Sequence, residues 1–235
     1  MQKQLAGKIA LITGASSGLG AAIAKKYIDE GAHLIIVGRN LKRLEAIDDY
    51  AQEQGSSTTI VQLDLMDYPK IAELGQKIAE RFGHLDIVVG NAAILGELTP
   101  LDHLHFKVWD KVIATNLTAN WHLIRITNPL LQKSPNGGRA IFVTCDVTKE
   151  PLAYWGAYCA SKAGLENLVR TYAAENLKNK LKVCLIDPGV MATKLRRDAM
   201  PSMDDSSWPK PESATQLFMK AALDNSLISG SLIRI

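Results

Sequence analysis

Short runs of apolar residues, rich in valine, isoleucine and leucine, recur along the chain and are separated by longer mixed segments. A short run that is apolar throughout and ends at a turn is typical of a strand buried on both faces. The predicted strands cover residues 8–13, 33–37, 58–63, 85–89, 140–144, 182–186 and 232–235.

The segments between these runs carry good helix formers, with apolar residues at helical spacing. Predicted helices cover residues 21–30, 41–54, 69–82, two stretches of 106–130, 157–177 and 212–223. Strands that alternate with helices predict βαβ units and a parallel sheet covered on both faces. Right-handed crossovers then give an α/β, doubly wound, Rossmann-type sheet of about seven strands, in one domain over residues 1–235. In such a sheet ligands bind at the carboxyl ends of the strands.

Residues 191–211 fit neither pattern. They contain paired arginines, Met200, Met203, Trp208 and the acidic pair Asp204-Asp205, and they are broken by prolines. This mixture of apolar and charged side chains suits a mobile flap over a substrate pocket. An irregular surface loop is the alternative interpretation.

Composition and charge narrow the class of protein. The chain has 235 residues, of which 47% are hydrophobic, so it can bury a sizeable core. A net charge of +3, without blocks of like charge, gives no support for nucleic acid or a membrane as partner. The three cysteines (Cys145, Cys159 and Cys184) form no CxxC pair and fit a reducing compartment. No apolar signal core or membrane-spanning run is visible, so we expect a soluble cytoplasmic protein.

A glycine-rich turn follows the first predicted strand and precedes a helix, which is the context that a phosphate-binding loop requires. It reads Gly14-Ala15-Ser16-Ser17-Gly18-Leu19-Gly20. Glycines allow the backbone to approach a pyrophosphate closely, and free N–H groups with the helix dipole offset its charge. The spacing is Gly-x-x-x-Gly-x-Gly and differs from the common Gly-x-Gly-x-x-Gly fingerprint.

Arg39 suggests which dinucleotide binds. An acid near the end of the second strand would bind the ribose 2′-hydroxyl of NAD, whereas an arginine there accommodates a 2′-phosphate. No acid ends this strand, and Arg39 follows it. A guanidinium can bind a phosphate through paired hydrogen bonds. We therefore expect NADP(H) as the preferred cofactor, with NAD(H) as the alternative. The alternative for Arg39 itself is a solvated charge on a loop, without a role in binding.

Tyr158 and Lys162 are four residues apart in a predicted helix and therefore share one face. A phenol with its ordinary pKa of about 10 is a poor acid–base group at neutral pH. An ammonium group beside it favours the phenolate, so the spacing predicts that Lys162 lowers the Tyr158 pKa.

Two other chemistries are weaker interpretations. The glycine turn also matches the nucleophile elbow of hydrolases, with Ser16 as the nucleophile, but no histidine beyond His122 could serve as the late base. His103 and His105 lack a third ligand at suitable spacing, so no metal is expected.

With these motifs in place, the whole chain resembles the short-chain dehydrogenase/reductase family. The matching positions follow the family's order and spacing between residues 8 and 194: Thr13 to Gly20, Asp64, Asn91-Ala92, Asn116, Tyr158 with Lys162, Pro188-Gly189 and Thr193. Trp155-Gly156-Ala157-Tyr158 and the segment around Met200-Pro201 are similar to a bacterial group of uncharacterised oxidoreductases within that family.

The resemblance implies an NAD(P)-dependent oxidoreductase that transfers a hydride between nicotinamide and a small carbonyl or alcohol substrate, as a homodimer or homotetramer. Tyr158 would transfer the substrate proton, Lys162 would lower the pKa of Tyr158 and bind the nicotinamide ribose, and Asn116 would hold a water in the proton relay. The residues implied to line the cofactor are Gly14, Ser16, Ser17, Gly18, Leu19, Gly20, Asp64, Leu65, Asn91, Ala92, Tyr158, Lys162, Pro188, Gly189, Val190 and Thr193.

Two positions depart from the family pattern. The substrate-positioning serine is replaced by Cys145, whose thiol is a weak donor. Loss of one oxyanion donor can cost on the order of 10²–10³ in rate, and Thr144 or Asp146 could compensate only if their side chains pointed the same way. The family's Asn-Ala-Gly ends here in Ala93, which is harmless unless that backbone needs a positive φ. The alternative function is thus a catalytically impaired NADP-binding protein that acts as a binding or redox-sensing module.

Overall fold

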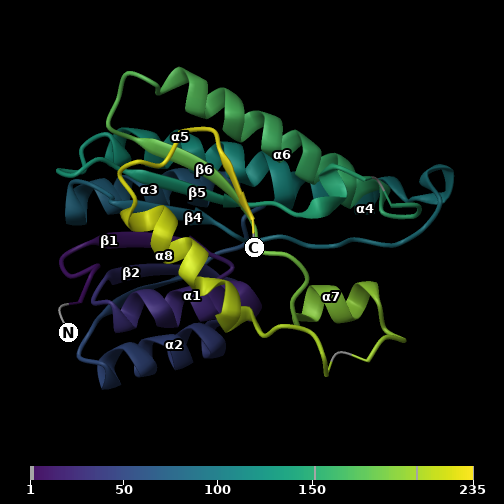
Figure 1. The fold of residues 1–235 in the computed structure, drawn as a ribbon, viewed down its shortest axis with the longest axis horizontal. Coiled ribbons are helices and arrows are strands. Elements are labelled where there is room, and N and C mark those ends of the chain that lie inside the picture. Colours follow the sequence, from purple (N-terminus) through teal and green to yellow (C-terminus); the bar gives the residue numbers. More distant parts are fainter. Residues whose placement is uncertain (1–2, 151, 205, 235) are drawn as a thin grey trace.

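The structure, a computed structural model, describes residues 3–150, 152–204 and 206–234. A seven-stranded parallel sheet forms its centre, in the order β3-β2-β1-β4-β5-β6-β7 (Figure 1). The strands are Ile9–Thr13 (β1), His33–Gly38 (β2), Thr58–Gln62 (β3), Ile87–Gly90 (β4), Arg139–Val143 (β5), Lys182–Asp187 (β6) and Leu232–Arg234 (β7). The predicted doubly wound fold is confirmed; Ile235, assigned to the last predicted strand, lies outside the described residues.

Helices cover both faces of the sheet. α1, α2 and α8 lie on one face, and α3, α5 and α6 lie on the other (Figure 1). The helices are Gly18–Asp29 (α1), Leu41–Glu53 (α2), Tyr68–Phe82 (α3), Phe106–Ile113 (α4), Ala119–Leu131 (α5), Gly156–Glu175 (α6), Lys194–Ala199 (α7) and Thr215–Leu223 (α8). No helix of the described chain is long and apolar enough to cross a membrane.

The two faces have separate cores because successive strand residues point to opposite sides. In β2, Leu34 and Ile36 pack into the core on the α1 side, whereas Ile35 and Val37 pack into the core on the α6 side. All four side chains are fully buried, which explains why the strand reads as one continuous apolar run.

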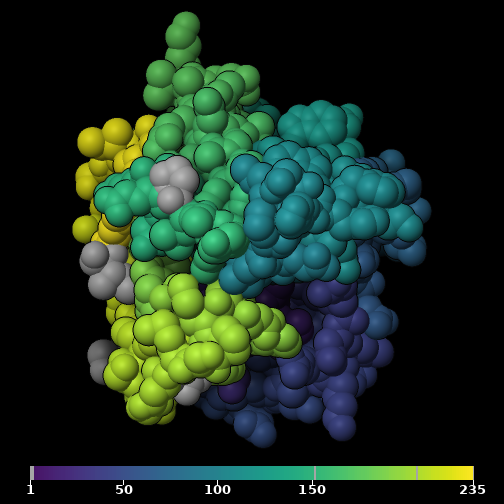
Figure 2. Space-filling view, turned by 90° about the vertical axis from the view of Figure 1, so that its right-hand side faces the viewer, coloured from purple at the N-terminus to yellow at the C-terminus, as the bar shows by residue number. Residues whose placement is uncertain are grey.

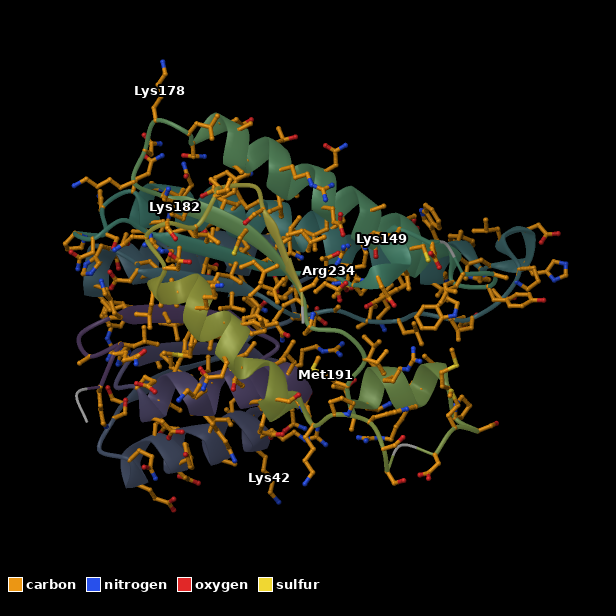
Figure 3. All side chains as sticks on the ribbon, viewed as in Figure 1. Lys42, Lys149, Lys178, Lys182, Met191 and Arg234 are labelled. Carbon is orange, nitrogen blue, oxygen red and sulfur yellow. The ribbon has the colours of Figure 1, made fainter. Side chains whose placement is uncertain are left out.

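Because every strand is parallel to its neighbours, all the strands end at the same edge of the sheet, here called the carboxyl edge. In Figure 3, Lys182 at the start of β6 and Met191 just beyond its end mark the amino edge and the carboxyl edge. The segment 191–211 lies at the carboxyl edge and contains α7, which the sequence analysis did not predict. Thr193 begins this helix, since its hydroxyl oxygen accepts a hydrogen bond from the Arg196 N–H at 3.3 Å.

Candidate active site

The glycine turn joins β1 to the first turn of α1 and leaves backbone donors available. Ser17 precedes the helix but makes no side-chain cap, so its hydroxyl does not satisfy the first N–H groups. A Cβ at Gly20 would lie 2.3 Å from the Gly14 carbonyl oxygen, and Gly18 has φ +53°. Residues with a side chain therefore do not fit at these two positions. The close backbone packing and the free N–H groups suit a pyrophosphate bound at the helix N-terminus.

Asn91, directly after β4, fixes this turn from the neighbouring strand. Its amide donates to the Thr13 carbonyl oxygen at 2.9 Å, and the N–H groups of Asn91 and Ala92 donate to the Thr13 hydroxyl at 3.0 and 3.2 Å. Ala93 does not need glycine, because Tyr154 is the only non-glycine residue with positive φ in the described chain. The departure from the family's Asn-Ala-Gly is thus harmless to the backbone.

Ser16 lies against Gly38 at the end of β2, directly before Arg39. A Cβ at Gly38 would lie only 3.1 Å from the Ser16 hydroxyl oxygen, which places that hydroxyl at the strand end from which Arg39 follows. Arg39 is exposed, and among the described residues its guanidinium has no hydrogen-bond partner. Asp64 and Leu65 follow β3 at the same edge, exposed and half-buried respectively. These side chains could line the adenosine end of a dinucleotide.

The segment after β6 reaches back to the glycine turn. Gly189, which follows Pro188, has φ +68°, and Val190 is 39% exposed. A Cβ at Gly18 would lie 3.4 Å from the Thr193 methyl carbon, so the start of α7 lies against the start of α1. Figure 2 shows the carboxyl edge, with a recess between the 191–211 segment and the first part of the chain.

Tyr158, Lys162 and Cys145 are brought together above β5. Tyr158 is 6% exposed and Lys162 is 2% exposed, both on the inner side of α6. The Lys162 ammonium donates to the Val143 carbonyl oxygen at 2.8 Å and lies 5.8 Å from the centre of the Tyr158 ring. Cys145 packs against the cluster that contains Tyr158, and its proximity further raises the pKa of the Tyr158 hydroxyl.

Burial controls the protonation of these three groups. It raises the pKa of Tyr158 well above its usual value, with a further increase from Cys145. It also lowers the pKa of Lys162 and raises that of Cys145. The expected net decrease of the Tyr158 pKa is not found, because burial raises this pKa: the i,i+4 spacing places the two residues together but does not report how completely α6 buries them. Burial therefore favours the neutral form of the Tyr158 phenol.

Asn116 lies in a π-helical turn, Ala114–Thr118, between α4 and α5, and is fully buried. Its amide oxygen accepts from the Ile94 N–H at 2.9 Å, and its nitrogen donates to the Ile94 carbonyl oxygen at 2.9 Å and to the Ser161 hydroxyl at 3.0 Å. No direct hydrogen bond joins Asn116 to Lys162 in the described parts of the chain. Asn116 thus connects the segment after β4 to the helix that carries Tyr158.

Glu166, a buried carboxylate on α6, was not among the predicted site residues. It accepts hydrogen bonds from the hydroxyl groups of Thr144 at 2.8 Å and Thr148 at 2.7 Å. Thr144 therefore does not take over the donor role of a serine at position 145, because its hydroxyl is already engaged. The available signal was the spacing, since Glu166 lies four residues after Lys162 and faces the same side.

The surroundings of the Tyr158 hydroxyl are largely apolar. Trp155 is 7% exposed and packs edge-on against Tyr158, with ring centres 5.8 Å apart. Leu195 and Met200 of the 191–211 segment pack against the same cluster. The described residues contain no group of three or more histidine, cysteine or acidic side chains that could hold a metal ion.

A doubly wound sheet that carries a glycine turn after β1 and a buried tyrosine–lysine pair at its carboxyl edge defines a nucleotide-dependent oxidoreductase. Residues 8–204 match the model of the short chain dehydrogenases, and the chain belongs to this family.

Relatives and solved structures agree with this assignment. The uncharacterized oxidoreductase YciK of Escherichia coli K12 is 33% identical over 228 residues, which cover 96% of this chain and 90% of YciK. A short chain dehydrogenase structure from Pseudomonas syringae has a TM-score of 0.95 at 30% identity and covers 100% of this chain and 96% of that chain. A short chain dehydrogenase of Escherichia coli CFT073, complexed with NADPH, has a TM-score of 0.94 at 31% identity, with 100% and 98% coverage.

Proposed function

We propose that the protein is an NADPH-dependent reductase of small carbonyl compounds, with Tyr158 as the proton donor. The observation that carries this proposal is the buried, neutral Tyr158 hydroxyl next to Lys162, at the same sheet edge as the glycine turn. A phenol whose pKa is raised keeps its proton and can give it to a forming alkoxide.

The cofactor proposal rests on two features. The close backbone packing of Gly14 with Gly20 and the uncapped start of α1 fit a pyrophosphate. Arg39, which follows Gly38 at the end of β2, offers a guanidinium to a 2′-phosphate, and a neighbour of known structure is complexed with NADPH. Lys162 and Thr193 would hold the nicotinamide end. NADPH, when bound, supplies the hydride.

Within this proposal each residue has a separate task. Tyr158 donates its proton to the substrate oxygen as the carbonyl carbon is reduced, and Lys162 stabilises the transient phenolate with its ammonium group. Asn116 fixes α6 by its hydrogen bonds to Ser161 and the Ile94 backbone, and could hold a relay water beside Lys162. The Cys145 thiol is a weak donor to the same substrate oxygen.

A second candidate, a cofactor-binding protein with little turnover, is favoured by one observation: the thiol of Cys145 packs against the Tyr158 cluster where the family has a serine hydroxyl. Such a protein would bind NADPH through the same turn. A redox-sensing role for Cys145 has less support, because burial raises the pKa of this thiol and keeps it in the less reactive neutral form.

The test is NADPH oxidation by the wild type and Cys145→Ser with a panel of aldehydes, ketones and diketones. We expect the wild type to turn over at least one carbonyl compound. Cys145→Ser should raise kcat by about tenfold or more, since a hydroxyl is the better oxyanion donor. If the wild type is inert with every compound while Cys145→Ser is active, the natural protein is a binding module and the proposal is wrong.

We further propose that the protein assembles as a homodimer or homotetramer. Phe106 and Trp109 on α4 and Trp121 on α5 are 64%, 38% and 43% exposed. Exposed aromatic groups on adjacent helices are typical of association surfaces. Light scattering after size exclusion should give a multiple of 25.6 kDa; a monomer at micromolar concentration would contradict this proposal.

A further inference from the structure

Glu166 is an ionisable residue buried in the helix that carries the tyrosine–lysine pair, and the proposed reaction does not use it. It is 6% exposed and lies two helical turns after Tyr158 and one turn after Lys162. Burying a carboxylate is costly unless hydrogen bonds and an ion pair compensate it. Here one carboxylate oxygen accepts from two threonine hydroxyls, and the other pairs with the half-exposed Arg170 at 2.8 Å.

The two threonines flank Cys145 on the turn that follows β5. Thr144 is buried, and its N–H donates to the Ile186 carbonyl oxygen at 2.9 Å, which continues the β5–β6 pairing. Thr148 ends the single 3₁₀ turn after Cys145, and its hydroxyl also lies 3.1 Å from the Cys145 carbonyl oxygen. The Glu166 carboxylate therefore contacts this turn on both sides of the residue that touches Tyr158.

We propose that Glu166 is a positioning residue of the active site: its carboxylate fastens the Thr144–Thr148 turn to α6 and so holds the Cys145 thiol against the Tyr158 hydroxyl. This inference rests on the proposed function for its kinetic meaning, but the geometric claim stands on the two hydrogen bonds from the turn to Glu166 and on the packing of Cys145 against the Tyr158 cluster. A glutamate whose role was only to stabilise α6 would need no partner on the turn after β5.

The charge of Glu166 acts on Lys162 as well. The groups that face the Lys162 ammonium are the Val143 carbonyl at the end of β5, Cys145 after it, and Tyr158 and Glu166 on its own helix. Two further acids act on the neighbours of Lys162: Asp146 raises the pKa of Tyr158, and Asp187 at the end of β6 raises that of Cys145. Burial lowers the pKa of Lys162, and the thiol and the Glu166 carboxylate oppose that change.

Three variants separate the hydrogen bonds of Glu166 from its charge. Thr148→Val removes one hydrogen bond and keeps the charge. Glu166→Gln removes the charge, and its amide oxygen can still accept from both threonines. Glu175→Gln changes an exposed glutamate of the same helix and is the matched control.

The first measurement needs no catalytic activity: the rate at which iodoacetamide alkylates Cys145, followed by mass spectrometry of the tryptic peptide 140–149. Cys159 falls in the separate peptide 150–162 and serves as an internal reference. Thr148→Val should speed alkylation of Cys145 by about tenfold, as expected for loss of one hydrogen bond to a charged group, with Cys159 unchanged. Glu166→Gln and Glu175→Gln should stay within about twofold of the wild type, since neither loses the threonine contacts.

The second measurement is the pH profile of kcat/KM for NADPH oxidation. In Glu166→Gln the alkaline limb should move to lower pH, because Lys162 loses a charge that raises its pKa; in Thr148→Val and Glu175→Gln the limb should stay in place. Unchanged alkylation of Cys145 in Thr148→Val would overturn the positioning role, whatever the kinetics show. If the wild type proves inert, the proposed function fails while the alkylation result still decides the role of Glu166.

Discussion

The amino and carboxyl edges of the sheet differ in whether their polar side chains have hydrogen-bond partners. At the amino edge, Asp86 is 3% exposed and accepts hydrogen bonds from the Lys8 ammonium at 3.2 Å, the Ile9 N–H at 3.0 Å and the Ser134 hydroxyl at 2.6 Å. Arg139, also buried, donates to the Gly137 and Gly138 carbonyl oxygens, and to Asn225 at 2.6 Å.

At the carboxyl edge, several polar groups lack such partners. Ser17 does not cap α1, and the Arg39 guanidinium has no hydrogen-bond partner among the described residues. Tyr154, with φ +73°, keeps a strained backbone there. Apart from the Arg139 Nε, which is buried without a hydrogen-bond partner among the described residues, the donors named at the amino edge are satisfied and stabilise the fold, whereas those at the carboxyl edge are left available for binding.

Tyr158→Phe should give the largest effect on activity. The change removes the proton donor and keeps the ring that packs against Trp155. We expect kcat to fall by about 10²–10⁴ while the Kd for NADPH stays within about threefold. Steady-state kinetics and cofactor fluorescence measure the two quantities. A variant that keeps more than a tenth of the wild-type kcat would remove Tyr158 from the chemistry.

Asp86→Ala should give the largest effect on stability, because it leaves Lys8 without its buried partner. We expect the free energy of unfolding to fall by about 3 kcal/mol, with kcat unchanged below the transition. Urea denaturation measures the difference, and the exposed Asp49→Ala should change it by less than about 0.5 kcal/mol. A large loss of kcat in the folded variant would contradict the claim that the amino edge contributes to stability and not to activity.

The same pair of proteins tests a pH dependence. Burial acts to raise the Asp86 pKa, but hydrogen bonds from Ser134, Ile9 and Lys8 outweigh it and hold the pKa below its usual value. A depressed pKa in the folded state gives stability that is present above the unfolded-state pKa of about 4 and is lost as pH falls through the folded-state value. The stability gap between the wild type and Asp86→Ala should therefore narrow below about pH 4; a constant gap down to acid unfolding would contradict this account.

Arg39→Ala tests whether the charge at the carboxyl edge contributes to cofactor binding. Loss of a charge-assisted hydrogen bond to the 2′-phosphate should weaken NADPH binding by about tenfold to a hundredfold and leave NADH binding unchanged. Isothermal calorimetry with both cofactors measures this. Lys178, which projects from the far end of the molecule (Figure 3), gives the matched control Lys178→Ala. Equal weakening for both cofactors would mean that Arg39 does not contact the phosphate.

Tyr154→Gly should give the smallest effect, and in the opposite direction. Tyr154 is 60% exposed, so glycine relieves the positive φ with little loss of packing. We expect a gain of about 1 kcal/mol in the free energy of unfolding, whereas Leu152→Gly should lower it. Thermal denaturation compares the two variants. Destabilisation by Tyr154→Gly would show that the ring makes contacts that outweigh the strain.

Local patterns predicted the sheet and the positions of the site, since a buried strand reads as an apolar run and a phosphate-binding turn needs its glycines in sequence. Residues 33–37 and the turn from Gly14 to Gly20 are examples, and β2 is His33–Gly38 in the structure. The short helix α7 was missed, although Thr193 is a good N-cap residue, because the segment around it is irregular and broken by prolines.

Properties that depend on burial and on contacts between distant segments could not be predicted in this way. In the sequence Glu166 has the pattern of an ordinary exposed helix charge. Its partner Thr144 lies 22 residues earlier in the chain, on the turn after β5, and the contact forms only when the chain folds. The raised pKa of Tyr158 likewise comes from the packing of α6 and not from its spacing to Lys162.

The central claim is that the natural protein, with Cys145 in place, transfers a hydride to a carbonyl group while Tyr158 supplies the proton. The most direct test incubates [4,4-²H₂]NADPH and a carbonyl panel with the wild type, Tyr158→Phe and Cys145→Ser, and measures deuterium in the alcohol product by mass spectrometry. We expect one deuterium per product molecule with the wild type, more product with Cys145→Ser, and cofactor binding without product for Tyr158→Phe. Label that appears only with Cys145→Ser would contradict it.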